Sequence, residues 1–156
     1  MAQTVATEGG RLLTFAEWGA HDGVPIFSMH GTPGCRLPSR RRIENGWAAV
    51  LDELGVRVIT HDRPGYGGSD RQPGRSVADT AADVAAIAGA LGIDRFAVEG
   101  GSSGSAHALA VAAQLGSRVR RVAVTAPMAP YVVLGPVEWS AGQDAEVQSY
   151  VAACLQ

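Results

Sequence analysis

The sequence predicts an α/β fold built on a mostly parallel sheet with helices on its faces. Short runs rich in β-branched and aromatic residues alternate with stretches whose apolar residues recur at helical spacing, as in strands joined by crossover helices. Two loops rich in glycine and proline, at residues 30–34 and 61–70, directly follow β-rich runs. The chain of 156 residues, 46% of them hydrophobic, can bury one ordinary core, so we expect one domain.

An antiparallel hairpin is predicted at the N-terminal edge of the sheet. Residues 3–18 hold two β-rich runs around a turn at residues 8–10, where two glycines supply the positive φ that hairpin loops demand. Four further strands are expected, because each of these short segments is apolar and is followed by turn residues or a helical pattern. They are residues 24–29, 56–60, 96–99 and 119–125.

Three helices are predicted between these strands. Over residues 39–54 the apolar side chains recur every three or four residues and Gly55 ends the pattern, which predicts one continuous helix. A second helix is expected to begin at Ser76, whose hydroxyl can cap it, with Asp79 three residues further on. The third is expected over about residues 103–115.

A candidate nucleophile lies between the strand that ends at Glu99 and the third helix. Residues 100–104 fit the pattern G-x-S-x-G at a strand-to-helix turn. Such a turn is sharp and strained, and the strand and helix approach so closely that only glycine fits at Gly100 and Gly104. We therefore expect Ser102 to project above the sheet, where the positive end of the helix favours negative charge on a bound oxygen.

Two backbone amides are predicted to face this serine. One is the N–H of Ser103, directly after the nucleophile. The other comes from the loop HGTPG at residues 30–34. Gly31 and Pro33 constrain this loop and leave the Thr32 N–H free to face the turn that holds Ser102. Together these two amides would form an oxyanion hole.

Three segments together resemble the α/β-hydrolase superfamily, especially its bacterial esterase-like and aminopeptidase-like members. They are HGTPG at residues 30–34, DRPGYGGSD at residues 62–70 and VEGGSSGSAHALA at residues 98–110, in the order and on the strand ends that the family uses. The resemblance spans roughly residues 10–130. It implies a partial α/β-hydrolase fold, with residues 1–130 as the N-terminal half of the core.

The resemblance also implies roles for individual residues. Ser102 matches the nucleophile of the family, and Thr32 and Ser103 match the oxyanion-hole positions whose backbone amides act. His30 and Asp62 match structural positions in the loops around the site. The activity implied is that of a serine hydrolase acting on a small ester or amide substrate, with no cofactor and no metal.

The later triad members are missing from the expected places. In this fold the triad runs Ser, then Asp or Glu, then His, yet the only histidine after Ser102 is His107, which a helix would turn away from the serine. We expect the chain to be truncated relative to its family, and a poor hydrolase alone, because an unassisted serine is a weak nucleophile. The acids that follow are Glu138, Asp144 and Glu146, in a tail with no predicted strand.

Other interpretations of these residues stay open at this point. Ser102 could be a small residue in a tight turn, within an inactive hydrolase remnant or an interaction module. A phosphate-binding turn is a further alternative, although the glycines miss G-x-G-x-x-G and the chain has no lysine for a Walker loop. Cys35 lacks a convincing base partner, and His21 and His61 are expected to be loop or strand-end residues.

Composition excludes several classes of protein. The net charge is −2, and the 13 basic residues are all arginines dispersed among acids apart from residues 40–42, so we expect no nucleic-acid partner. Residues 1–10 do not resemble a signal peptide. Residues 122–137 are too short and too rich in proline to cross a membrane. Two cysteines form neither a disulfide framework nor a metal site, which favours a cytoplasmic protein.

Two expectations concern the end of the chain. Residues 131–156 are expected to be the start of a cap segment or a tail. The strand at residues 119–125 would be an unpaired sheet edge, because the chain holds about half the strands of an eight-stranded sheet. An exposed edge of this kind is a possible site of homo-oligomer formation.

Overall fold

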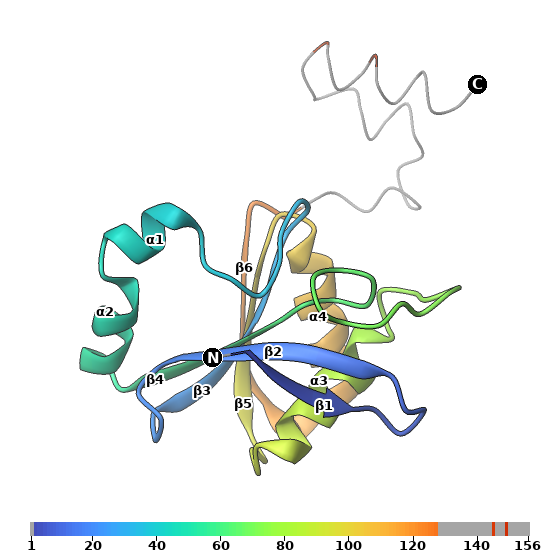
Figure 1. Cartoon of the computed structure of the whole chain (residues 1–156), viewed down its shortest axis with the longest axis horizontal. Coiled ribbons are helices and arrows are strands. Elements are labelled where there is room, and N and C mark those ends of the chain that lie inside the picture. Colours follow the sequence, from blue (N-terminus) through green and yellow to red (C-terminus); the bar gives the residue numbers. More distant parts are fainter. Residues whose placement is uncertain (1, 128–144, 146–148, 150–156) are drawn as a thin grey trace.

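The structure is a computed structural model that describes residues 2–127, 145 and 149. Within this part a six-stranded mixed sheet has the order β1-β2-β4-β3-β5-β6 (Figure 1). The predicted cap segment or tail, and the acids Glu138, Asp144 and Glu146, lie outside the described residues. The strands are β1 Gln3–Ala6, β2 Leu12–Gly19, β3 Val24–Met29, β4 Val56–His61, β5 Phe96–Gly101 and β6 Val119–Thr125.

The predicted α/β class is confirmed, including the N-terminal antiparallel hairpin. Strand β1 pairs antiparallel with β2, and β2 pairs antiparallel with β4. The pairs β3–β4, β3–β5 and β5–β6 are all parallel. The hairpin turn closes with a 2.9 Å hydrogen bond from the Gly10 N–H to the Thr7 carbonyl, and Gly10 has φ of +77°, a value that favours glycine.

Helices cover both faces of the sheet (Figure 1). Helices α1 and α2 lie on one side, where α2 contacts β2 and β4. Helices α3 and α4 lie together on the other side, where α4 contacts β3, β5 and β6. None of the described helices is long and apolar enough to cross a membrane. Their bounds are α1 Arg40–Glu44, α2 Trp47–Glu53, α3 Thr80–Ala90 and α4 Gly104–Leu115, with a short 3₁₀ helix at Gly116–Arg118.

The core lies between the sheet and the pair α3 and α4. Side chains of four strands, β2, β3, β4 and β5, enter it from one face of the sheet, because successive strand residues point to opposite faces. The rings of Phe27 and Phe96 pack with their centroids 4.8 Å apart. Burying each large apolar side chain contributes roughly 1.5–3 kcal/mol. The fully buried apolar residues include Leu13, Phe27, Met29, Ile59, Val84, Ile87, Phe96, Val98 and Val111.

The prediction of one helix over residues 39–54 is wrong. The chain breaks it into α1 and α2 at Asn45 and Gly46, where Gly46 has a left-handed φ of +67°. An Asn-Gly pair favours such a left-handed helix end, and this outweighs the apolar periodicity. Ile43 and Leu54 accordingly remain more than 60% exposed.

The start of the second helix also differs from the prediction. Helix α3 begins at Thr80, and no hydroxyl cap from Ser76 forms. Instead the Asp79 carboxylate accepts hydrogen bonds from the N–H and the hydroxyl of Ser76, at 2.6 and 2.8 Å. Only the acidic half of the predicted capping box is therefore present, because the intervening residues form tight turns with bonds such as Thr80 N–H to the Val77 carbonyl.

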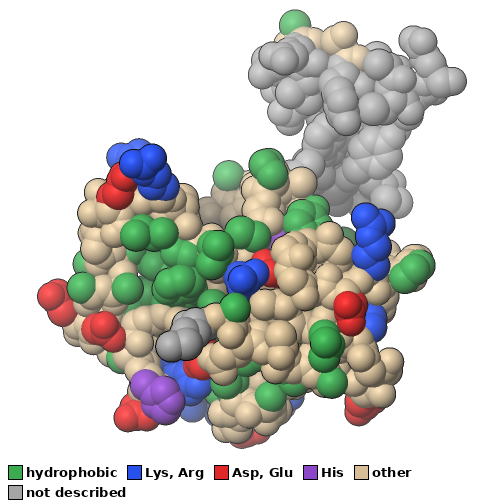
Figure 2. Space-filling view, in the orientation of Figure 1, with side chains coloured by type: hydrophobic (Ala, Val, Ile, Leu, Met, Phe, Trp, Pro, Cys, Tyr) green, Lys and Arg blue, Asp and Glu red, His purple; other side chains and the backbone are tan. Residues whose placement is uncertain are grey.

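Two surface features bear on what the protein contacts. Arginines 40–42 gather over α1 (Figure 2), and all three side chains are exposed, as expected for a solvated helix. Within the described residues β6 pairs only with β5 and forms an edge of the sheet. Val122 and Val124 of this edge strand are 41% and 37% exposed.

Candidate active site

Ser102 occupies a sharp turn between β5 and α4. Its φ is +53°, and among the described residues only one other non-glycine residue, Ala126, also has a positive φ. A non-glycine residue in this region is strained, and such strain clusters at functional sites. The turn is held by hydrogen bonds of 3.0 Å from the Ser102 N–H to the Thr125 carbonyl and from the Ser105 N–H to the Ser102 carbonyl. The serine is exposed.

Close backbone contacts explain the two flanking glycines. A Cβ on Gly100 would lie 2.3 Å from the Gly104 carbonyl oxygen, and a Cβ on Gly104 would lie 2.2 Å from the carbonyl oxygen of Met29. Neither distance is sterically possible, so any side chain would push α4 away from β5 or β3. The two glycines thus allow the turn at Ser102 and the start of α4 to lie in close contact with β5 and β3.

The loop after β3 lies directly against the elbow. A Cβ on Gly31 would be 3.3 Å from the Ser102 Cβ and 3.9 Å from its hydroxyl oxygen. The Ser103 hydroxyl donates a 3.0 Å hydrogen bond to the Thr32 hydroxyl oxygen. Within residues 2–127 neither the Thr32 N–H nor the Ser103 N–H donates to another group of the chain. The structure therefore brings Gly31, Thr32, Ser102 and Ser103 together with two amides free.

His107 is buried on α4 and is held at both ring nitrogens. Its Nδ1 lies 2.7 Å from the Thr80 hydroxyl, and its Nε2 contacts the guanidinium of Arg63. Burial, followed by the positive charges of Arg63 and Arg75, lowers the pKa of His107 to about 4. The ring is therefore neutral near pH 7 and is bound to Thr80 and Arg63 rather than to Ser102.

His30 supports the loop that it begins. Its Nδ1 lies 2.8 Å from the Gly31 carbonyl oxygen, and its Nε2 accepts from the N–H of Arg63 at 3.3 Å. The ring also meets the ring of Tyr66 edge-on, with centroids 5.1 Å apart. Burial is the main cause that lowers the pKa of His30. The side chain thus ties the loop after β3 to the loop after β4.

Asp62 makes a second tie between these two loops. Its carboxylate accepts from the N–H and the guanidinium of Arg36, at 2.8 and 2.5 Å, and from the N–H of Gly68 at 3.0 Å. Burial alone would raise the pKa of Asp62, but these hydrogen bonds outweigh it and hold the pKa below its usual value. A Cβ on Gly67 would lie 2.1 Å from this carboxylate, so glycine is required there.

His21 and His61 are a loop residue and a strand-end residue, as expected. His21 is exposed in a turn, with its Nδ1 3.0 Å from the Asp22 carboxylate. His61 ends β4 and is fully buried, and within the described part of the chain neither ring nitrogen has a hydrogen-bond partner. Burial, followed by nearby positive groups, lowers the pKa of His61 to about 3.

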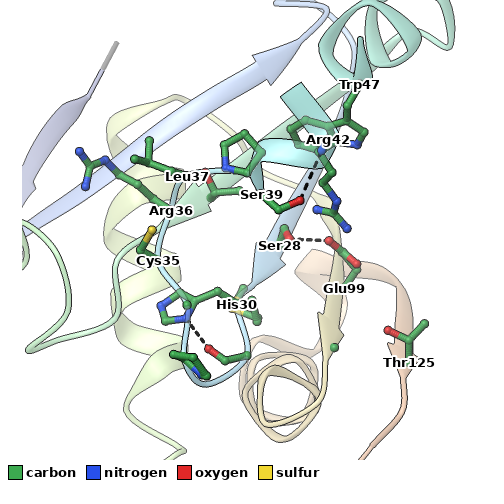
Figure 3. Close-up of a pocket in the computed structure, with 17 residues that line it drawn as sticks. Ser28, His30, Cys35, Arg36, Leu37, Ser39, Arg42, Trp47, Glu99 and Thr125 are labelled. Atoms are coloured by element: carbon green, nitrogen blue, oxygen red, sulfur yellow. Dashed lines mark hydrogen bonds between the residues drawn. The ribbon is translucent and has the colours of Figure 1, made fainter. Parts of the chain in front are cut away.

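A cavity of about 610 Å³ opens beside the loop after β3 (Figure 3). Phe27 and Met29 face the core, so Ser28 between them faces the opposite side of the sheet, where its hydroxyl bonds the Glu99 carboxylate. Trp47, with the Arg42 guanidinium 5.2 Å from its ring centroid, also lines the cavity. This cavity was not predicted from the sequence. The signal that could have indicated it is a polar residue within each of two otherwise apolar strands, Ser28 in β3 and Glu99 in β5.

Comparison with known proteins identifies the family. A family model described as alpha/beta hydrolase fold matches residues 24–155. The chain therefore belongs to the α/β-hydrolase family, and the resemblance indicated by its motifs is confirmed.

Relatives and a solved structure agree with that assignment. The non-heme chloroperoxidase of Streptomyces lividans is 36% identical over 133 residues, 83% of this chain and 46% of that protein. The proline iminopeptidase of Xanthomonas citri is 34% identical, over 65% of this chain and 31% of that protein. The bifunctional esterase/perhydrolase of Acinetobacter calcoaceticus is 34% identical, over 64% and 35%. An alpha/beta hydrolase fold protein from Nakamurella multipartita has a TM-score of 0.67 at 31% identity, over 82% and 42%. The chain spans less than half the length of each.

The buried histidines predict a loss of stability in acid. Below pH 6.5 the unfolded chain protonates His61, whereas the folded protein does not until about pH 3. The free energy of unfolding should therefore fall, as the pH decreases, by roughly 1.4 kcal/mol per pH unit for this group. The substitution His61→Leu should reduce the pH dependence of the free energy of unfolding by the contribution of one proton. Urea denaturation between pH 6 and 4 measures this dependence.

The matched control for this prediction is the exposed histidine of the β2–β3 turn. The substitution His21→Gln should leave the slope of stability against pH unchanged, because this side chain is on the surface. An unchanged slope in His61→Leu would contradict the interpretation of His61 as a buried neutral group.

Proposed function

We propose that this protein is a serine hydrolase in which Ser102 is the nucleophile and the backbone amides of Thr32 and Ser103 form the oxyanion hole. The observation that carries the proposal is the contact between the exposed, positive-φ Ser102 and the Gly31 loop, with both amides free. Gly31, His30, Gly100 and Gly104 support that arrangement. Two donors aimed at one oxygen suit an anionic tetrahedral intermediate.

The proposed reaction is acyl transfer from a carboxylic ester or amide. The Ser102 oxygen bonds to the carbonyl carbon, and the carbonyl electron pair moves to the oxygen, which accepts from the two amides. The serine proton passes to a base and then to the leaving alcohol or amine as that bond breaks. Water next attacks the acyl-enzyme, releases the acid and regenerates the Ser102 hydroxyl.

Names among the relatives support this substrate class. One relative is an esterase/perhydrolase and another is an iminopeptidase, so ester and peptide chemistry both occur on related chains. We extend that class, and no narrower one, to this protein. The free thiol of Cys35 supports the further proposal of a reducing, cytoplasmic location.

The base of the reaction is proposed to lie outside the four histidines of this chain. His30 and His107 each use both ring nitrogens within the fold. His61 is sealed in the core, and His21 is on a distant turn beside Asp22. The residues described here thus provide the nucleophile and oxyanion half of a site that another segment or another chain would complete with an acid and a base.

Labelling with an alkyl fluorophosphonate tests the nucleophile. Excess reagent should modify Ser102 slowly, because a serine without its base reacts several orders of magnitude more slowly than one in a full triad. Added imidazole should accelerate labelling, since it can accept the serine proton. Intact mass and peptide mapping locate the adduct.

Two neighbouring serines provide the control. The substitution Ser102→Ala should abolish the adduct, whereas Ser103→Ala should retain it because the Ser103 amide, not its hydroxyl, belongs to the proposed oxyanion hole. Equal labelling of the original protein and Ser102→Ala would refute the assignment of the nucleophile.

A second candidate function is an interaction module or inactive remnant that binds through its sheet edge. The observation in its favour is β6, which is an edge of the sheet formed by the described residues and in which Val122 and Val124 are exposed. Unpaired backbone groups on such a strand favour pairing with another chain. A homo-oligomer joined along β6 is the simplest assembly of this kind.

Mass measurement by light scattering tests this second candidate. The protein should show a concentration-dependent dimer, and the double substitution Val122→Lys with Val124→Lys should return it to a monomer, since edge lysines oppose strand pairing. The exposed pair Ile43→Lys with Val50→Lys, on α1 and α2, serves as the control and should still dimerise. A monomer at every concentration of the original protein would rule out oligomer formation through this edge.

A further inference from the structure

The guanidinium of Arg63 is the buried charge that the proposed reaction leaves unused. Arg63 follows β4 and is only 5% exposed. Within the described residues it has no carboxylate partner at ion-pair distance, although it is more buried than the arginines that do have one. The partly buried arginines that pair with an acid are Arg11, Arg36, Arg57 and Arg75. A buried charge without a counter-ion is costly unless neutral acceptors satisfy it.

Three residues of the loop beside Ser102 supply acceptors to Arg63. Its Nη2 donates to the Thr32 hydroxyl oxygen at 3.0 Å and to the Gly31 carbonyl oxygen at 3.3 Å. Its Nε and backbone N–H donate to Nε2 of His30, at 3.4 and 3.3 Å. Most of the donors of this side chain are therefore directed at three consecutive residues of one loop.

We propose that Arg63 is a positioning residue, which fixes the peptide between Gly31 and Thr32 so that the Thr32 amide stays available to the oxyanion. This inference rests on the proposed function. Because a trans peptide points its carbonyl and its N–H in opposite directions, holding the Gly31 oxygen determines where the Thr32 N–H points. Arg63 and His30 both hold that oxygen (Figure 3 shows the His30 bond).

The opposite orientation of this peptide would destroy the site. If it flipped, the Gly31 carbonyl oxygen would replace the N–H and repel an anionic intermediate. The flip would also take an acceptor away from the buried guanidinium, which is costly in the core. Because the Arg63 guanidinium depends on neutral acceptors such as the Gly31 carbonyl, it makes the flipped orientation of this peptide unfavourable.

A chain of buried contacts through His107 and Thr80 holds Arg63 in place. A guanidinium can only donate, so Nε2 of His107 must be its acceptor and the ring proton sits on Nδ1. That proton is directed at the Thr80 hydroxyl, 2.7 Å away at the start of α3. The Arg63 guanidinium also lies 4.9 Å from the centre of the Tyr66 ring. Helices α3 and α4 thereby connect to the oxyanion loop through one chain of contacts.

Two measurements on the full chain test the proposal, and the first is the rate of Ser102 labelling. In Arg63→Met the rate constant for fluorophosphonate labelling should fall by about 10²-fold, the effect of losing one oxyanion donor. Arg63→Lys should be intermediate, because a lysine keeps the charge but not the fork of donors. If Arg63→Met does not fold, Arg63→Lys still provides the test.

The second measurement follows the peptide itself and needs no reaction at Ser102. The ¹⁵N–¹H residual dipolar coupling of Thr32 should change in both Arg63 variants and stay unchanged in Arg57→Met, an arginine of β4 paired with Glu17 instead. A folded Arg63→Met protein whose Thr32 coupling matches the original would overturn the positioning role, whatever its labelling rate. Absent labelling in the original protein with a changed coupling would instead refute the hydrolase function alone.

Discussion

The close approach of three backbone segments at the top of the sheet is the constraint on which the site depends. Gly100 and Gly104 let α4 begin within contact of β5 and β3, at distances where any Cβ would overlap a carbonyl oxygen. That approach forces the intervening serine into a left-handed turn with φ of +53°. The strain is maintained because the core beneath, between the sheet and α3 and α4, is closely packed.

The loops around Ser102 are fixed by hydrogen bonds rather than by apolar packing. Asp62 links the loop after β4 to Arg36 beyond the β3 loop, and Arg63 links it to Gly31 and Thr32. In the proposed reaction these bonds would hold the two amides in place before substrate binds, which is the condition for electrostatic stabilisation of an anion without reorganisation. The same proposal assigns proton transfer to groups other than the four histidines.

Much of this architecture could be predicted because it follows from local rules. Strands β3 and β6 have the predicted bounds, since short apolar runs between turn residues specify them. Strand β5 runs two residues beyond its predicted end, into Gly100 and Gly101, because glycine carries no strand signal of its own. The break at Gly46 shows a local turn preference overriding an apolar pattern that no partner surface supported.

The role proposed for Arg63 could not be predicted from the sequence, for a different reason. Its partners come from the β3 loop, from α4 and, through His107, from the start of α3. No spacing along the chain indicates that such distant residues converge on one side chain. Only the fold shows that Arg63 is buried and has no carboxylate partner among the described residues. This observation becomes informative once its acceptors are known.

In the proposed site, Thr32 and Ser103 present their backbone amides to an oxygen bound at Ser102. A crystal structure of the phosphonylated protein tests it most directly, because the phosphonyl oxygen occupies the place of the oxyanion. We expect this oxygen at roughly 2.7–3.1 Å from both backbone nitrogens. A well-ordered adduct whose oxygen points to solvent, beyond hydrogen-bond distance of both amides, would contradict it.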